Sequence, residues 1–179
     1  MECTQAELQD FEEVVRLYWP CIYRFILASV RNTDAAQALT QDCFLRSYYK
    51  RGSFRGQASV KTWLMKIAVN LVHDFGRNRR LQFWKRLNTD GVNPGDFSDH
   101  LPASGISPED RVSLKEQVEI IWQASRSLPD RQRTVFLLRF VEDMDLLEIA
   151  AATGMTEGTV KIHLFRAIHA IRERLGSWR

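Results

Sequence analysis

The sequence predicts an all-α protein whose helices fall into two groups separated by a linker. Apolar residues recur at three- and four-residue steps on both sides of the middle of the chain, and no segment shows the alternation typical of a half-buried strand. Residues 87–110 contain three prolines and three glycines without a periodic apolar pattern, which indicates a flexible linker. The length of 179 residues by itself allows one domain or two small ones.

Three helices are expected before the linker. The apolar positions of the first, which Pro20 is expected to kink, are Phe11, Val14, Val15, Tyr18, Ile22, Phe25 and Ile26. The second begins near Asp34, which can cap it, and its apolar positions are Leu39, Cys43, Phe44 and Tyr48. The third begins near Ser59 and continues to about Arg80, and its apolar side consists of Trp63, Leu64, Ile67, Ala68 and Leu71.

The other side of the third expected helix carries hydrogen-bonding and cationic side chains. The positions that fall within about 80° of one another on the helical wheel are Thr62, Lys66, Asn70, His73 and Arg77. This row begins beside the loop Phe54–Ala58. It can follow a nucleic acid strand, and the Asn70 amide can read a base edge. A solvated amphipathic face is the alternative interpretation.

A helix-turn-helix is expected near the C-terminus. After the linker, the pattern predicts a helix from about Pro108 to Ser127 and a further helix with Pro129 in its first turn. Residues 145–169 then predict a short helix, a glycine turn and a second helix, as in readers of the DNA major groove. Gly154 can adopt the positive φ that ends the first helix, and the Thr156 hydroxyl can cap the second.

The last expected helix has an apolar stripe and a mixed outer face. The stripe consists of Val160, Leu164, Ala167, Ile168, Ile171 and Leu175. The outer face consists of Gly158, Thr159, Ile162, Phe165, Arg166 and His169, with Lys161 and His163 on its flanks. It offers cations for phosphate and guanine and apolar groups for a thymine methyl. An ordinary helical hairpin with a solvated basic face is the alternative.

The charge is distributed unevenly along the chain, although the net value is only +3. Residues 46–86 contain 11 Lys and Arg and a single acidic residue, whereas residues 87–110 contain five acidic residues and no basic one. A basic density of this kind suits contact with a phosphate backbone, although a solvated charged face is also common.

Composition excludes several other classes of protein. No apolar run is as long as a membrane span, and the acidic N-terminus differs from a signal peptide, so we expect a cytoplasmic protein without direct membrane insertion. The three cysteines are an odd set with no closely spaced pair, which argues against a disulfide framework or a zinc site. Four histidines accompany no evident nucleophile, phosphate-binding loop or metal-ligand spacing. We therefore expect no enzyme, no metal and no cofactor.

Four segments of the chain, in order, resemble the extracytoplasmic-function group of bacterial sigma factors, small relatives of sigma-70. These segments are Asp42–Arg46, Phe54–Asn70, Leu128–Arg133 and Glu157–Lys161. The resemblance covers nearly the whole chain. It implies a two-domain transcription initiation factor with a sigma-2 domain at 1–86, an acidic linker at 87–110 and a sigma-4 helix-turn-helix domain at 111–179.

The resemblance also implies a role for each surface. The sigma-2 domain would bind the clamp helices of the largest RNA polymerase subunit through Gln41, Asp42, Leu45 and Arg46. It would hold the unpaired minus 10 strand through Arg55, Gln57, Ala58, Thr62, Lys66, Asn70, His73 and Arg77, with Asn70 and the loop around Gln57 and Ala58 enclosing a flipped base. The sigma-4 domain would bind the minus 35 duplex through Thr159, Lys161, His163, Phe165 and Arg166.

The partners implied by the resemblance are polymerase core, promoter DNA and an anti-sigma factor, and the sigma-4 domain would rest on the flap of the second-largest subunit. A conventional helix-turn-helix repressor or activator is the main alternative, but it leaves the basic third helix without a purpose. A pure interaction protein, such as an anti-anti-sigma factor, would not need both basic surfaces.

Overall fold

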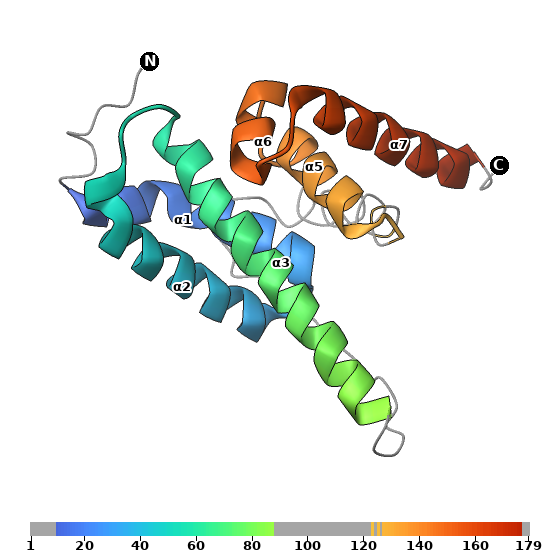
Figure 1. Cartoon of the computed structure of the whole chain (residues 1–179), viewed down its shortest axis with the longest axis horizontal. Helices are drawn as coiled ribbons and strands as arrows, with labels where there is room; N and C mark the ends of the chain where they lie inside the picture. Colours follow the sequence, from blue (N-terminus) through green and yellow to red (C-terminus); the bar gives the residue numbers. More distant parts are fainter. Residues whose placement is uncertain (1–9, 88–122, 124, 126, 177–179) are drawn as a thin grey trace, which may run out of the picture.

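The computed structural model describes residues 10–87, 123, 125 and 127–176, and every regular element in these residues is helical (Figure 1). The N-terminal unit consists of α1 (Phe11–Val30), α2 (Thr33–Lys50), the 3₁₀ turn η2 (Arg51–Ser53) and α3 (Val60–Leu87). The C-terminal unit consists of α5 (Asp130–Phe140), α6 (Leu146–Thr153) and α7 (Glu157–Gly176). The all-α prediction is therefore confirmed.

The three long helices of the N-terminal unit share one apolar core, in which each helix contacts the other two. Its fully buried side chains include Ile22, Phe25, Ile26, Cys43, Leu64 and Met65. Burial of each large apolar side chain contributes roughly 1.5 to 3 kcal/mol, so these positions dominate the stability of the unit. Trp19 extends the core by stacking on Phe44, with ring centroids 5.4 Å apart.

A side-chain oxygen caps the start of each of these helices. Asp10 accepts a hydrogen bond from the backbone N–H of Glu13 at 3.3 Å, and Asn32 accepts one from Ala35 at 2.7 Å. At the start of α3, the Ser59 hydroxyl accepts from the N–H of Thr62 at 3.1 Å. Each cap satisfies one of the N–H groups that lack a partner within the helix.

The cap of α2 is Asn32, so the expectation that Asp34 caps this helix is wrong. Asn32 has an extended backbone with φ −141° and ψ 118°, as a cap requires, whereas Asp34 already lies in the first turn. A carboxylate there still interacts favourably with the positive end of the helix dipole. Asn32 and Asp34 are both residue types that cap helices, so the sequence did not distinguish which of them begins α2.

Two other boundaries differ from expectation. The third helix continues to Leu87 rather than ending near Arg80, because no proline or glycine interrupts it after Gly76. Pro129 is the N-cap residue of α5, so it precedes the first turn instead of occupying it. Pro20 lies inside α1, as expected, and the kink predicted there stays a prediction. Most of the expected linker, the helix expected from Pro108 and the N-terminal cysteine lie outside the described residues.

The C-terminal unit packs α7 against both α5 and α6, and its buried core includes Val135, Leu138, Ile149, Val160 and Ala167. This unit also contacts the N-terminal unit, through α6 against α3 and α5 against α1. Figure 1 shows α3 crossing the molecule between α1 and α2 and the C-terminal helices. α3 therefore belongs to two packing surfaces at once.

Asn32→Ala should lower the free energy of unfolding by about 1 kcal/mol, because it removes the α2 cap. Asp34→Ala should cost less than about 0.5 kcal/mol, because it removes only a charge near the helix dipole. Urea denaturation followed by far-ultraviolet circular dichroism measures both. A larger loss in Asp34→Ala than in Asn32→Ala would contradict the assigned cap.

Candidate nucleic-acid and polymerase interfaces

The turn between α6 and α7 has the geometry of a helix-turn-helix. Asp145 and Glu148 form a capping box, in which each side chain accepts a hydrogen bond from the other residue's backbone N–H at 2.8 and 2.9 Å. Gly154 ends α6 with φ 71°, as expected. The Thr156 hydroxyl accepts from the N–H of Thr159 at 3.2 Å, which confirms the expected cap of α7.

α7 has the two faces expected from its sequence. Val160 and Ala167 are fully buried against the rest of the unit. On the other side, Ile162 and Phe165 are 54% and 70% exposed, which is unusual for large apolar side chains. Arg166 is exposed beside them, and the Lys161 ammonium lies 2.6 Å from the Glu157 carboxylate. This face presents apolar and cationic groups together.

His163 differs from its neighbours on α7 because it is partly buried and turned toward α5. It lines a small hollow with His73, Pro129, Arg131 and Gln132. Burial lowers the pKa of His163, and the positive charges of Arg131 and Arg166 lower it further. Both effects favour the neutral imidazole, which can offer hydrogen bonds but no charge.

The row expected on α3 is largely exposed. The side chains of Lys66, Asn70, His73 and Arg77 are all accessible, and Arg77 forms an ion pair with Asp74 at 3.3 Å. In the loop before α3, Arg55 and Gln57 are exposed and Ala58 is half-buried. Gly56 has φ 68°, a conformation that a residue with a Cβ adopts only with strain.

Thr62 is the exception, because it is only 2% exposed. Its hydroxyl shares a hydrogen bond of 2.8 Å with the Ser59 hydroxyl and lies 3.3 Å from the Glu148 carboxylate of α6. The sequence placed Thr62 in an open row, and helical periodicity could not reveal that α6 covers it. In this arrangement Thr62 is inaccessible to a nucleic acid.

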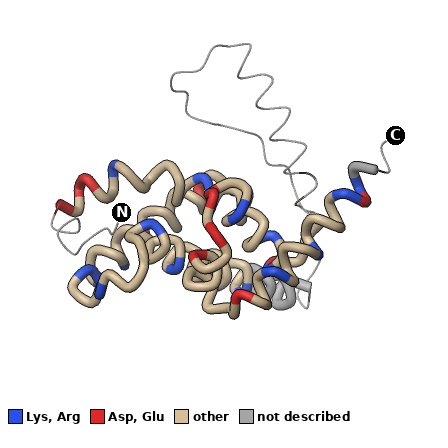
Figure 2. Tube along the Cα trace, turned by 90° about the horizontal axis from the view of Figure 1, so that it is seen from above, with Lys and Arg blue, Asp and Glu red and all other residues tan. Residues whose placement is uncertain are grey.

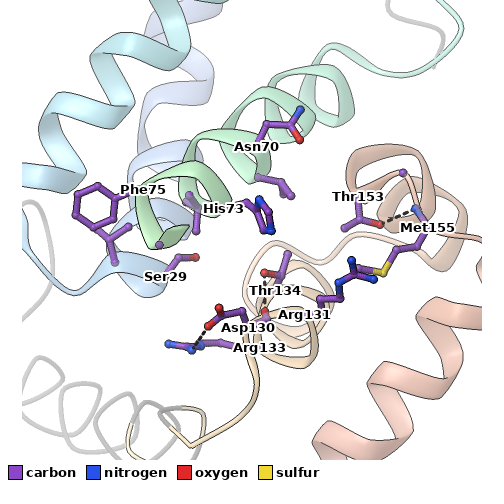
Figure 3. A pocket seen from close by; sticks show the side chains of 15 residues that line it. Ser29, Asn70, His73, Phe75, Asp130, Arg131, Arg133, Thr134, Thr153 and Met155 are labelled. Carbon is purple, nitrogen blue, oxygen red and sulfur yellow. Dashed lines mark hydrogen bonds and ion pairs between the residues drawn. The ribbon is translucent and has the colours of Figure 1, made fainter. Parts of the chain in front are cut away.

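A cleft of about 370 Å³ separates the two units beside this row (Figure 3). Asn70 and His73 line it from α3, and Arg131, Thr134 and Met155 line it from the C-terminal unit. Figure 3 shows His73 directed toward the α5 side of the cleft, with Asn70 on the preceding turn of α3. Part of the expected strand-binding row therefore faces the C-terminal unit.

The outer face of α2 combines an ion pair with exposed apolar groups. Asp42 and Arg46 form a two-point interaction, with both N–O distances 2.9 Å, and this bond raises the pKa of Arg46. Gln41 is exposed, and Leu45 is 55% exposed. All four residues expected to bind polymerase thus lie on α2. Gln41, Leu45 and Arg46 are exposed there.

Three further apolar side chains of the N-terminal unit are exposed, although helical periodicity did not predict it. Tyr49 is 76% exposed and Leu17 of α1 is 64% exposed, while Tyr48, expected in the buried stripe, is 42% exposed. The Arg51 guanidinium lies over the Tyr48 ring at 3.7 Å, a cation–π contact. Leu17 and Tyr49 lie outside the apolar positions expected to be buried, and this pattern in the sequence could have indicated their exposure.

Charged side chains are distributed over both halves of the described chain. Figure 2 shows basic and acidic positions interspersed along it. Among the described residues, no group of three or more His, Cys, Asp or Glu side chains could hold a metal ion. Within the same residues, no helix is long and apolar enough to cross a membrane.

Comparison with known proteins decides the family. Residues 14–82 match the model described as sigma-70 region 2, and residues 119–171 match sigma-70, region 4. The chain is also 30% identical over 171 residues to the ECF RNA polymerase sigma factor SigW of Bacillus subtilis, covering 96% of this chain and 91% of that protein. The chain belongs to the extracytoplasmic-function sigma factors of the sigma-70 family.

A second relative and a solved structure extend this comparison. The RNA polymerase sigma-H factor of Pseudomonas aeruginosa is 31% identical over 176 residues, with 96% of this chain and 89% of that protein covered. The sigma factor RpoE of Bartonella quintana, solved in complex with the anti-sigma factor NepR, has a TM-score of 0.72 at 24% identity. That alignment covers 96% of this sigma factor and 99% of the solved chain, and it shows the shared fold.

Membership in this family makes the protein a transcription initiation factor that directs RNA polymerase to promoters, and not an enzyme. The helix-turn-helix of α6 and α7 falls within the region 4 match, and α2 and most of α3 fall within the region 2 match. The exposed faces described above therefore belong to the two conserved regions of a sigma factor.

Gly154→Ala should lower the free energy of unfolding by about 1 to 2 kcal/mol, because alanine is strained at positive φ. A Cβ at this position would meet no atom within 4 Å, so the cost is backbone strain alone. Gly158→Ala is the matched control: it also meets no atom within 4 Å but lies within α7, so alanine should stabilise by up to about 1 kcal/mol. Thermal denaturation would contradict the turn geometry if both variants shifted in the same direction.

Proposed function

We propose that this sigma factor captures the minus 10 element as an unpaired strand along α3 and reads the minus 35 element as duplex through α7. The observation that carries the proposal is the presence of two separate exposed faces with different chemistry. The face on α3 offers amide, imidazole and cationic groups in a row, whereas the face on α7 begins at a helix-turn-helix. A sigma factor of this kind works with polymerase, so its site of action is the cytoplasm.

The minus 10 surface runs from the loop before α3 along the exposed row. It consists of Arg55, Gln57, Ala58, Lys66, Asn70, His73 and Arg77. Thr62, which α6 covers in this structure, joins this surface only when the C-terminal unit moves away from α3. From Lys66 to Arg77 the row is about 16 Å long at 1.5 Å per residue, which is enough to contact several nucleotides of one strand. Lys66 and Arg77 contact phosphates, while Asn70 and the loop around Gln57 and Ala58 enclose an unpaired base.

The minus 35 surface consists of Thr159, Lys161, His163, Phe165 and Arg166. Lys161 and Arg166 are suited to phosphate or guanine, and the exposed Phe165 ring is suited to a thymine methyl. Because the His163 imidazole is neutral, it contributes a hydrogen bond rather than charge attraction. The mixture of cationic and apolar contacts supports base reading in addition to backbone binding.

Polymerase core binds the outer face of α2 in this proposal. Leu45 and Tyr49 supply exposed apolar area, and the Asp42–Arg46 pair supplies oriented charges beside it. These features fit the clamp helices of the largest subunit, while the C-terminal unit rests on the flap of the second-largest subunit. The anti-sigma complex of the Bartonella relative supports the further proposal that an anti-sigma factor binds this protein.

Asn70→Ala should reduce promoter melting while leaving duplex binding unchanged, because the base that Asn70 contacts is accessible only after strand separation. The experiment combines RNA polymerase core, this protein and a promoter selected from a pool, with permanganate footprinting of unpaired thymines. Core with the unmutated protein should give footprints at the minus 10 element, and core alone should give none. With Asn70→Ala the footprint should weaken roughly fivefold or more, equivalent to about 1 kcal/mol.

The matched control is Asn78→Ala, which removes an exposed amide two turns further along α3. Footprints of equal strength in Asn70→Ala and the unmutated protein would remove Asn70 from the minus 10 surface. Tight binding of a palindromic duplex by the free protein, without core, would favour the repressor alternative over the proposed mechanism.

Lys161→Ala and Arg166→Ala should each weaken binding of the minus 35 duplex by about 1 to 3 kcal/mol, because both cations project from the exposed face of α7. Fluorescence anisotropy of polymerase complexes on a labelled duplex, at one fixed salt concentration, measures the effect. Arg16→Ala is the control, since Arg16 is an exposed cation on α1 that pairs with the nearby Glu13. Equal losses in all three variants would indicate a general charge effect and contradict the assignment.

A further inference from the structure

We infer that the free sigma factor is held closed by an ion-pair latch between Arg24 of α1 and Glu142 of the loop after α5. In the closed form the C-terminal unit covers part of the minus 10 surface, so the latch must open before the unpaired strand can bind. This inference rests on the proposed function only for the identity of the ligand. The closed contact itself follows from the side chains described below.

The latch joins two residues that are 118 positions apart in the chain. The Nε of Arg24 donates to one carboxylate oxygen of Glu142 at 2.9 Å, and its terminal nitrogen donates to the other at 2.8 Å. The Glu142 side chain is completely buried. In addition, the Lys61 ammonium of α3 donates to the backbone carbonyl of Glu142. One residue of the C-terminal unit therefore binds two helices of the N-terminal unit.

The loop that carries Glu142 is fixed by its own backbone. The N–H groups of Val141 and Glu142 donate to the carbonyl of Leu137 at 2.9 and 3.1 Å. The N–H of Met144 donates to the carbonyl of Leu138 at 3.0 Å, and Asp143 between them has φ 52°. These bonds hold Glu142 in place at the end of α5 before any contact with Arg24, so the latch loses little loop entropy on closing.

Closure covers the proposed DNA surface at two places. Thr62 is buried beneath α6, with its hydroxyl bonded to Ser59 and Glu148. Further along α3, Asn70 and His73 face the cleft whose opposite wall belongs to α5 and α6 (Figure 3). A strand that contacts the whole row would occupy the space of these two helices, so DNA binding and closure compete.

The charges of Arg24 and Glu142 make the latch specific in geometry but weak in free energy. Burial raises the pKa of Glu142, and the hydrogen bonds and charge of Arg24, together with the charge of Lys61, only partly oppose this shift. The same bond raises the pKa of Arg24. The cost of removing the carboxylate from water thus opposes its attraction to the guanidinium. A competing surface of polymerase or DNA can open such a contact.

Lysine acylation of the full-length protein tests the closed contact. Lys61 is half-buried and bonded to Glu142, whereas Lys66 on the same helix is exposed and serves as an internal standard. The ratio of their reaction rates with an acetyl N-hydroxysuccinimide ester is measured by peptide mass spectrometry. Arg24→Ala leaves the Glu142 carboxylate buried without its guanidinium, which disfavours closure, and should raise the Lys61 to Lys66 ratio about fivefold or more.

The direction of the change in the lysine ratio distinguishes opening of the latch from a local effect of the lost charge. Loss of the Arg24 guanidinium alone leaves the Glu142 carboxylate free to attract the Lys61 ammonium more strongly, which slows acylation. Faster acylation in Arg24→Ala therefore reports exposure. Adding Glu142→Gln to Arg24→Ala removes the buried charge, so the double variant should be less open than Arg24→Ala. Arg16→Ala, the same change at an exposed pair on α1, should leave the ratio unchanged.

A labelled single-stranded minus 10 oligonucleotide tests the consequence for DNA. Arg24→Ala should bind it more tightly, by a factor similar to the increase in the lysine ratio, and adding Asn70→Ala should remove the gain. An unchanged or lower lysine ratio in Arg24→Ala, with far-ultraviolet circular dichroism showing intact helices, would overturn the latch. A raised ratio with unchanged oligonucleotide affinity would overturn control of DNA binding by the latch. If Asn70→Ala has no effect in the opened protein, the minus 10 assignment fails while the lysine result still supports closure.

Discussion

A buried carboxylate, that of Glu142, connects the C-terminal unit to two helices of the N-terminal unit. Glu142 lies at the end of α5, yet its bonds reach Arg24 on α1 and Lys61 on α3. A buried charge is tolerated only where donors surround it, so the position of α5 and α6 on the N-terminal unit is restricted to orientations that supply them. The same orientation places α6 beside α3 and leaves the cleft next to it.

α3 serves two functions with different physical requirements. Its apolar side, with Leu64, Met65 and Ala68 fully buried, holds the N-terminal unit together. Its polar side carries Lys66 to the surface and places Asn70 and His73 at the cleft that faces the C-terminal unit. A rigid helix with a packed side positions such groups more accurately than a loop does. The helix that supports the core is thus also the proposed platform for the minus 10 strand.

Local chemistry in the sequence accounted for most of the fold. The amphipathic periods predicted α1, α2, α3 and α7, since helical spacing depends only on neighbouring positions in the chain. The turn at Gly154 and the cap at Thr156 were also predicted, because a positive φ and a hydroxyl cap are requirements of single residues. The exposed faces of α3 and α7 followed from the same periodicity, with the family resemblance supplying their proposed roles.

The sequence by itself thus determined the helices, the turn and which side of each helix is polar. Tertiary structure alone decided which polar groups are accessible: Thr62 lies under α6, and His163 is partly buried beside α5, where burial lowers its pKa. It also revealed Glu142, which has no distinguishing neighbours in sequence and gains its importance from Arg24, 118 positions away. Periodicity records which face of a helix is apolar, but burial of a polar group depends on a partner that only the folded chain brings near.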